Sequence, residues 1–323
     1  MEQTTRPKIV VIGGGTGVAT VLSHLKKVSD VTAIVSMMDS GGSSGKLRDE
    51  HGVLPPGDVL KCINQLLPED ERSLKWRDFL GYRFQKGEGL KGHTLGNLLL
   101  TASYDWEGST SFGIEAISWL LNLQGQVLPV TLNNVELVAR LSDGREVFGE
   151  TNIDLRTQDL DHKIEYISLS RRAQIFRPAA EAIRNADKIV IGPGSLFTSV
   201  LPNFLVEGVS EALNESKAIK IYICNLVTDP AETDGYKASD FIRKIDEYLE
   251  ETDVLDYAIV NNGVISDLVL RMYETEHKFP VEADAEIAQK YVRREIILNN
   301  FGKGKEVLRH DSEKLANTIL ELG

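Results

Sequence analysis

The stretch KIVVIGGGTG, residues 8–17, decides the fold class. A run of β-branched residues that ends in glycines is typical of a buried parallel strand. The following residues, 16–27, repeat apolar side chains with the period of a helix, and a second buried strand follows at residues 31–35. A strand, a glycine turn, a helix and a strand within about thirty residues predict a βαβ unit.

The same order of elements returns in the second half of the chain. Buried strands are predicted at residues 188–192, 219–224 and 256–260, with helices near residues 199–213 and 238–249. With the first two strands these make five, and strands that alternate with helices predict a doubly wound parallel sheet. The fold class is therefore α/β.

The middle of the chain follows a different pattern. Residues 135–141 and 146–149 flank the sequence SDGR, and Asp-Gly between two alternating runs favours a β-hairpin. Residues 163–169 are a candidate third strand. We expect an antiparallel insertion at about residues 130–170, within a single domain that covers residues 1–323.

Composition and charge narrow the class of protein. Hydrophobic residues make 42% and charged residues 26% of 323 residues, which is typical of a globular protein with a large core. The net charge of −12 gives the chain no overall basic footprint, which argues against nucleic acid as a partner. Two isolated cysteines, Cys62 and Cys224, favour a reduced, cytoplasmic setting. The longest charge-free stretch, residues 116–135, contains amides, glycine and proline, so no membrane insertion is expected.

The first glycine-rich loop, GGGTG at residues 13–17, opens the first helix. Backbone N–H groups at a helix N-terminus bind anions, and glycine lets a phosphate approach the backbone. Gly14, Gly15 and Thr16 are therefore candidate phosphate ligands. Val18 stands where G-x-G-x-x-G requires a third Gly or Ala, which disfavours an NAD-dependent oxidoreductase. The alternative is a tight turn without a ligand.

A second loop, DSGGSSGKLR at residues 39–48, follows the second strand. It resembles a Walker A loop, but Ser40 replaces its first glycine and Leu47 its Mg²⁺-binding hydroxyl, so we reject a P-loop. The composition still suits an anion cradle, and Asp39 could contact a ribose. The alternative is a solvated, flexible loop. Five residues are candidate ligands here: Asp39, Gly41, Gly42, Ser43 and Ser44.

Two further segments carry polar residues at predicted helix starts. In PPGD, residues 55–58, Asp58 is expected to be the N-cap of the next helix, and a base or metal ligand is the alternative. In GHTLGN, residues 92–97, a helix is predicted to begin near Thr94. His93 and Asn97 face a ligand in one interpretation and are structural in the other, because a lone histidine is usually structural.

The later strands also end in polar loops. These loops are GPGSLFTS at residues 192–199, NLVTDPAET at residues 225–233, and NNG at residues 261–263. Carboxyl ends of parallel strands share one edge of a sheet, so these loops predict a large crevice for a phosphorylated or nucleotide ligand. The candidate ligands are Gly194, Ser195, Asn225, Thr228 and Asn261. No G-x-S-x-G, Ser–His–Asp set or His/Cys cluster occurs, so neither a catalytic residue nor a protein metal site is assigned.

In this order, the motifs resemble the gluconeogenesis-factor (YvcK-type) branch of the CofD-like family. The matching stretches are residues 13–17, 41–48, 56–58, 92–100, 128–129, 191–203, 222–236 and 308–316, which span nearly the whole chain. The resemblance implies a Rossmann-like three-layer α/β/α fold. It also implies binding of a UDP-sugar, notably UDP-N-acetylglucosamine, and a role in carbon metabolism, cell shape and cell-wall synthesis.

The sequence departs from the family pattern at three loops. Ser40 replaces an aspartate, Leu60 stands where the family has an arginine, and DPAET follows Thr228 where the family has QPGET. Tyr273 and Arg309 fall where the family pattern implies contacts with a uridine nucleotide. A tyrosine ring could stack on the base, and an arginine could pair with the diphosphate. The alternatives are a partly buried aromatic ring and a surface cation.

The sequence therefore predicts a cytoplasmic regulator that binds a UDP-sugar. The alternative function is that of the family's transferases, which move a phospholactyl group from a nucleotide-activated donor with Mg²⁺, here with Asp39 or Asp58 as its ligand. The resemblance assigns no reaction to the gluconeogenesis-factor branch. A homo-oligomer is compatible with the sequence, although no motif requires one.

Overall fold

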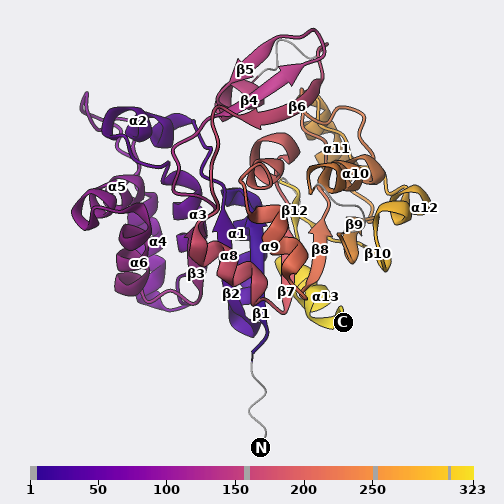
Figure 1. The fold of residues 1–323 in the computed structure, drawn as a ribbon, viewed down its shortest axis with the longest axis horizontal. Coiled ribbons are helices and arrows are strands. Elements are labelled where there is room, and N and C mark those ends of the chain that lie inside the picture. The colour runs from indigo at the N-terminus through magenta and orange to yellow at the C-terminus, as the bar shows by residue number, and fades with distance from the viewer. Residues whose placement is uncertain (1–5, 156–160, 250–253, 305–306) are drawn as a thin grey trace, which may run out of the picture.

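The computed structural model describes residues 6–155, 161–249, 254–304 and 307–323. Its centre is a seven-stranded sheet in the order β10-β9-β8-β7-β1-β2-β3, with parallel neighbours throughout (Figure 1). The predicted doubly wound α/β fold is confirmed. The strands are β1 (Lys8–Gly13), β2 (Asp30–Val35), β3 (Gln126–Pro129), β7 (Lys188–Ile191), β8 (Ile219–Ile223), β9 (Tyr257–Asn261) and β10 (Glu295–Asn299).

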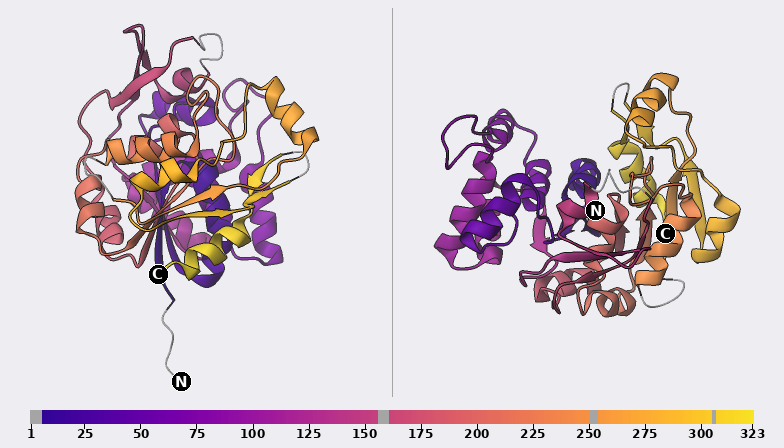
Figure 2. Two further views of the ribbon diagram at one scale, coloured as in Figure 1. Left: turned by 90° about the vertical axis from the view of Figure 1, so that its right-hand side faces the viewer. Right: turned by 90° about the horizontal axis from the view of Figure 1, so that it is seen from above.

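Helices cover both faces of this sheet (Figures 1 and 2). On one face, α1 (Gly15–Val28) packs against α3 (Gly57–Leu66) and α13 (Ser312–Glu321). On the other face lie α8 (Arg177–Arg184) and α9 (Val209–Glu215). The central strand β1 is apolar because it is covered from both sides, and Ile9, Val11 and Ile12 have no exposed surface.

The remaining helices extend the fold at the two edges of the sheet (Figure 1). Beside β3 lie α2 (Gly42–His51), α4 (Glu71–Gly81), α5 (Leu95–Glu107) and α6 (Thr110–Leu121). Toward β10 lie α10 (Ala238–Tyr248), α11 (Asp267–Thr275), α12 (Ala285–Ala288) and the 3₁₀-helix η3 (Gln289–Tyr291), with the short pair β11 (Gly302–Lys303) and β12 (Arg309–His310). None of the helices within the described residues is both long enough and apolar enough to cross a bilayer.

Two strands of the sheet were not among the five predicted ones. β3 and β10 are the edge strands, and an edge strand lacks a continuous buried run because one side faces solvent. In β10, Glu295, Leu298 and Asn299 are exposed, and β3 has only four residues and ends at Pro129. Neither segment therefore carries the apolar pattern that revealed the central strands.

The single helix predicted at residues 199–213 is wrong. The chain instead forms a π-helix η1 (Leu196–Val200), a 3₁₀-helix η2 (Leu201–Asn203) and then α9. Pro202 has no N–H to continue an α-helix, and Gly208 adopts φ +96°, which ends any helix that reaches it.

The predicted hairpin insertion is confirmed. β4 (Leu137–Leu141) pairs antiparallel with β5 (Glu146–Phe148) and with β6 (Ile164–Leu169), so the candidate third strand is present. A short helix, α7 (Glu150–Asp154), leaves β5 toward the main sheet, while residues 156–160 of the predicted insertion lie outside the described residues. Leu137 and Ile153 belong to the same core cluster as Ile12 of the main sheet. The insertion lies above the carboxyl ends of the main strands (Figure 1).

Candidate functional site

The order in which strands join the sheet reverses between the parallel neighbours β1 and β7. From β1 the chain builds outward through β2 to β3, and it then returns to place β7 on the other side of β1. The loops that follow β1 and β7 therefore leave the sheet in opposite directions. In open α/β sheets such a switch point at the carboxyl edge is where ligands bind.

The two loops at this point touch each other. A Cβ atom built on Gly14 would lie 2.6 Å from Cβ of Ser199, and one built on Gly17 would overlap the carbonyl of Pro193. Gly14 and Gly15 are buried, whereas Thr16 is exposed in the first turn of α1. Glycine is thus required here because another segment of the chain passes within contact distance.

A pair of carboxylates lies beside the first loop. A Cβ atom on Gly15 would lie 2.7 Å from Cα of Asp58, and one on Gly57 would lie 2.9 Å from Oδ2 of Asp39. Burial, and then the charge of Asp58, raise the pKa of Asp39. Lys61 Nζ donates to Asp58 Oδ1 at 2.9 Å and offsets part of this charge. The predicted N-cap role of Asp58 is wrong, because Pro56 is the N-cap and Asp58 lies inside the first turn of α3.

The second glycine-rich loop ends at the N-terminus of α2. Gly41 N donates to Asp39 Oδ1 at 2.8 Å, which orders the loop, and Gly42 then starts the helix with φ +46°. The first turns of α1 and α2 contain no acidic side chain. The first turn of a helix leaves N–H groups without a partner inside the helix, and these groups and the positive ends of the two helix dipoles lie at the same edge of the sheet, an arrangement that suits an anionic ligand.

His93 and Asn97 converge on the second loop from α5. Ser43 Oγ lies 3.0 Å from His93 Nδ1, and Asn97 Nδ2 donates to Ser43 Oγ at 3.0 Å. All three side chains are buried. The predicted start of the helix is also confirmed, because Thr94 caps α5 through its hydroxyl. In the described part of the chain Asn97 Oδ1 has no hydrogen-bond partner, so this buried acceptor is left for a ligand or a water.

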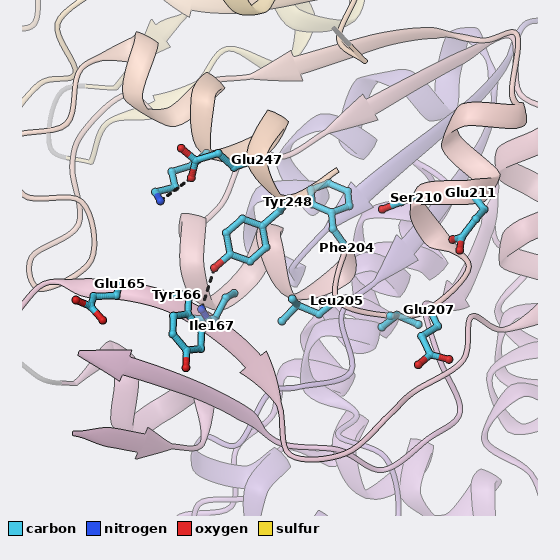
Figure 3. Close-up of a pocket in the computed structure, with 12 residues that line it drawn as sticks. Glu165, Tyr166, Ile167, Phe204, Leu205, Glu207, Ser210, Glu211, Glu247 and Tyr248 are labelled. Carbon is cyan, nitrogen blue, oxygen red and sulfur yellow. Dashed lines mark hydrogen bonds and ion pairs between the residues drawn. The ribbon is translucent and has the colours of Figure 1, made fainter. Parts of the chain in front are cut away.

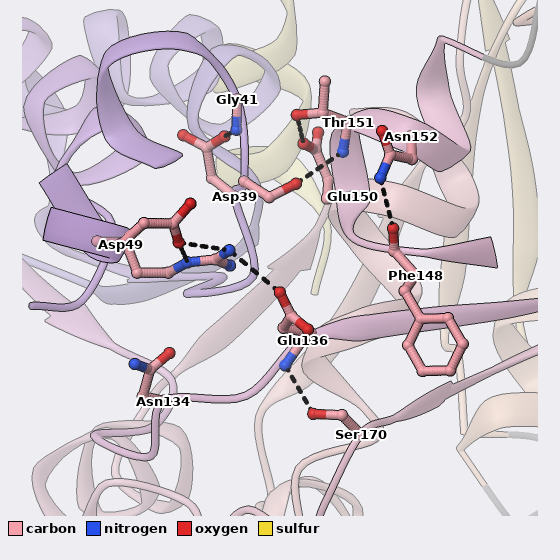
Figure 4. Close-up of polar contacts among 12 residues, drawn as sticks. Asp39, Gly41, Asp49, Asn134, Glu136, Phe148, Glu150, Thr151, Asn152 and Ser170 are labelled. Atoms are coloured by element: carbon pink, nitrogen blue, oxygen red, sulfur yellow. Dashed lines mark hydrogen bonds and ion pairs between the residues drawn. The ribbon is translucent and has the colours of Figure 1, made fainter. Parts of the chain in front are cut away.

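The insertion contributes side chains that the sequence did not predict (Figure 4). Thr151 N, at the start of α7, donates to Ser40 Oγ at 2.9 Å, and Thr151 Oγ1 donates to Glu150 Oε2 at 3.1 Å. Burial, and then the charge of Asp39, raise the pKa of Glu150 to about 7. No sequence signal relates residue 150 to residue 40, because only the folding of the hairpin over the sheet brings them together.

The insertion is also tied to α2. Arg48 donates to Glu136 Oε1 at 3.1 Å, just before β4, and Ser170 Oγ accepts a hydrogen bond from Glu136 N at 3.0 Å (Figure 4). These contacts fix one end of the antiparallel sheet, where the chain enters β4 and leaves β6, relative to the second loop. Arg48, predicted only as part of an anion cradle, is thus a structural anchor.

The loop after β7 faces carboxylates. Glu232 accepts hydrogen bonds from Phe197 N at 3.1 Å and from Thr198 Oγ1 at 2.9 Å, at the start of η1. Burial, and then the charge of Asp229, raise the pKa of Glu232 to about 8. Ser195 forms a hydrogen bond with Asp229, whose own pKa is raised mainly by burial. Gly194 and Ser195 therefore lie at the carboxyl edge of the sheet, but the chain's own carboxylates already occupy the adjacent helix start.

Asn225 and Thr228 follow β8. Thr228 Oγ1 accepts a hydrogen bond from Phe279 N at 3.1 Å, and its backbone N–H donates to Phe279 O at 2.7 Å, so Thr228 joins two segments of the chain. Asn225 is half-buried, and within the described residues its Oδ1 atom has no hydrogen-bond partner. Like Asn97, it holds an unused acceptor at this edge of the sheet.

Asn261, Tyr273 and Arg309 gather around the β11–β12 pair. Asn261 Oδ1 accepts hydrogen bonds from Phe301 N at 2.8 Å and Gly302 N at 3.1 Å. The Tyr273 hydroxyl accepts one from Leu308 N at 3.2 Å. Both side chains therefore hold the fold, whereas Arg309 is exposed on β12. Of these three residues, Arg309 is therefore the one whose side chain is free to reach a ligand.

A half-buried histidine that was not predicted links this group to the sheet. His310 Nε2 lies 3.1 Å from the carbonyl oxygen of Cys224, and burial lowers the pKa of His310 to about 4. A neutral imidazole that donates to this carbonyl fixes β12 beside the end of β8. Because His310 is the residue after Arg309, the contact also positions that arginine.

Comparisons with known proteins identify the family. The family model described as "2-phospho-L-lactate transferase CofD" matches residues 9–301. A putative gluconeogenesis factor of Thermotoga maritima is 44% identical over 317 residues, which cover 97% of this chain and 98% of that protein. The gluconeogenesis factor of Bacillus subtilis is 38% identical over 323 residues, covering 98% of each chain.

A solved structure agrees with these matches. The X-ray structure of a Bacillus halodurans protein superposes with a TM-score of 0.92 at 39% identity, covering 98% of this chain and 100% of that chain. A second structure from the same organism is described as a member of the UPF0052 family. The resemblance inferred from the sequence motifs is thus confirmed over nearly the whole length. This chain belongs to the CofD family and lies in its gluconeogenesis-factor branch.

Proposed function

We propose that this protein is a cytoplasmic regulator of carbon metabolism that binds a UDP-sugar, with UDP-N-acetylglucosamine as the first candidate. The observation that carries the proposal is that hydrogen-bond donors and unused hydrogen-bond acceptors lie at the same edge of the sheet. The first turns of α1 and α2 offer N–H groups for a diphosphate. Asn97 and Asn225 offer buried amide oxygens, which suit the N–H and O–H groups of a base or an N-acetyl sugar.

The names of the relatives support the metabolic part of this proposal. Proteins that match nearly the whole chain are named gluconeogenesis factors. A link to cell shape and cell-wall synthesis follows if the ligand is a UDP-sugar, because the amount of ligand would then report the supply of an activated sugar. No turnover is needed for this role, since binding alone shifts a conformational equilibrium.

The second candidate is phospholactyl transfer, which the description of the family model names. It is favoured by the proximity of Asp39 and Asp58. Mg²⁺ is usually held by one or two carboxylates together with substrate phosphates, and these two residues fit that pattern. Among the described residues no group of three or more His, Cys, Asp or Glu side chains is arranged to hold a metal ion. Bound Mg²⁺ would neutralise the diphosphate charge of a nucleotide-activated donor.

The experiment is a thermal-shift panel with UDP-N-acetylglucosamine, UDP-glucose, UMP, GMP, NAD and ATP, with and without Mg²⁺. A ligand at about 100 times its Kd adds about 2.7 kcal/mol to the free energy of unfolding. We expect a shift with UDP-sugars that is reduced in Asn97→Ala and Asn225→Ala. The control, Asn214→Ala, alters an exposed amide on α9 and should keep it. No binding of any UDP-sugar at millimolar concentration would refute the proposal, and Mg²⁺-dependent turnover of a nucleotide-linked donor would favour the transferase.

A further inference from the structure

A cavity of about 490 Å³ is lined by residues outside the glycine-rich loops. Figure 3 shows the side chains that line it. It is bounded by β6, by the segment between η2 and α9, and by α9 and α10. Its apolar wall consists of Ile167, Phe204, Leu205, Val206 and the ring of Tyr248. The Tyr248 hydroxyl accepts a hydrogen bond from Ile167 N at 2.8 Å, which closes the wall between α10 and β6. The volume falls within the range of small-molecule sites.

The rim of this cavity is strongly acidic. It carries Glu165, Glu207, Glu211 and Glu247, against a single lysine, Lys244. Lys244 Nζ already donates to Glu247 Oε2 at 2.7 Å. Glu207 lies 3.5 Å from the guanidinium of Arg172.

Two of the four carboxylates carry an uncompensated charge. In the described part of the chain, Glu165 and Glu211 have no ion pair and no side-chain hydrogen bond. Figure 3 shows them at opposite ends of the cavity, Glu165 on β6 and Glu211 on α9. An occupant that neutralises both must therefore carry separate positive charges.

A largely buried serine that lines the cavity gives a second, independent indication of a ligand. Ser210 lines the cavity and only 8% of its surface is exposed. Within the described residues its hydroxyl group makes no hydrogen bond. Because Ser210 lines the cavity, this hydroxyl group is free to form a hydrogen bond with an occupant.

We propose that this cavity binds an aliphatic polyamine. Its terminal ammonium groups would pair with Glu165 and Glu211, and its methylene chain would lie along Phe204 and Leu205. An amine N–H would donate to the hydroxyl of Ser210. The aromatic rings of Phe204 and Tyr248 add favourable contacts with a desolvated cation. This proposal is independent of the proposed UDP-sugar site, because none of the candidate UDP-sugar ligands lines this cavity.

The test is calorimetric titration of the full chain with spermidine, putrescine and n-butylamine, and with MgCl₂ at matched ionic strength. We expect spermidine to bind more tightly than putrescine, with no measurable binding of n-butylamine or Mg²⁺. Glu165→Gln and Glu211→Gln should each weaken spermidine binding by up to about fivefold, as expected for exposed ion pairs. Ser210→Ala should weaken it further.

The matched control is Glu115→Gln, which removes the same charge from α6 on the other side of the molecule (Figure 1). It should bind spermidine like the unaltered chain, and circular dichroism should show that every variant is folded. The proposal is overturned if Mg²⁺ competes as well as spermidine does, or if the double variant Glu165→Gln/Glu211→Gln keeps full affinity. Binding of an oligolysine peptide without binding of free spermidine would also overturn it, because the occupant would then be a protein segment.

Discussion

Thr198 Oγ1 donates a hydrogen bond of 2.9 Å to the buried carboxyl group of Glu232. The two residues are 34 positions apart, in the loops that follow β7 and β8. This contact joins the two loops at the carboxyl edge and holds an ionisable group that is almost entirely shielded from water.

Replacement of Glu232 should change the pH dependence of stability. The pKa of Glu232 is raised from its usual 4.5 to about 8, so between these values the folded chain holds a proton that the unfolded chain releases. The free energy of unfolding therefore falls as the pH rises through this window. Glu232→Gln should flatten the plot of Tm against pH between pH 5 and 8. Glu150, with a pKa of about 7, leaves a smaller slope of the same sign. An unchanged slope in Glu232→Gln would contradict this assignment.

Gly17→Ala should destabilise the fold. The added methyl group overlaps the carbonyl of Pro193, so α1 and the loop after β7 must separate. Overpacking of this kind costs about 1–3 kcal/mol or more. Chemical denaturation measures the loss. Gly89→Ala is the matched control, since its Cβ meets no atom within 4 Å, and equal stability of the two variants would rule out the predicted overlap.

Asp39→Asn should stabilise the protein near neutral pH. The raised pKa of Asp39, caused mainly by burial and by Asp58, means that its charged form is disfavoured in the folded state. Asparagine keeps an oxygen that can accept the hydrogen bond from Gly41 N. The melting temperature at pH 7.5 should rise and the gain should vanish near pH 4. Asp105→Asn, an exposed residue on α5, is the control, and a lower Tm for Asp39→Asn would show that its carboxylate is stabilising.

Arg309→Ala and Tyr273→Phe should separate ligand binding from folding. Tyr273→Phe loses the hydrogen bond from Leu308 N, at a cost of about 1 kcal/mol in the free energy of unfolding. Arg309→Ala alters an exposed side chain and should leave that free energy within about 0.5 kcal/mol. It should nevertheless lower UDP-sugar affinity about tenfold, as expected for a lost charge-assisted pair. The reverse pattern would assign the nucleotide contact to Tyr273.

The sequence predicted the central strands and the glycine-rich loops because their signals are local. The buried run before Gly13 and the Asp-Gly turn of the insertion each specify one structure within a few residues. The edge strands β3 and β10 carry no such run, and the helix after β7 is broken by Pro202 and Gly208. The branch of the family was also predicted correctly, because several motifs in one order are more specific than any single motif.

Side-chain roles were harder to predict than positions. Asn261 and Thr228 lie at the expected edge, yet their polar atoms pair with backbone groups of distant segments. Glu150 and Glu232 were not predicted at this edge of the sheet, because their burial depends on how the insertion and two later loops fold. The roles of all the candidate ligands in binding stay predictions until the titrations above are made.

The enclosure of the first glycine-rich loop has a kinetic consequence. Ser199, Asp58 and Pro193 pack against its glycines, so we expect the loop to be held in place before a ligand arrives. Recognition at this loop should then proceed without a slow rearrangement. In stopped-flow mixing the observed rate should increase linearly with ligand concentration, and the association rate constant should approach about 10⁶ M⁻¹s⁻¹ or more. The heat-capacity change of binding should be correspondingly small, because little apolar surface is newly buried.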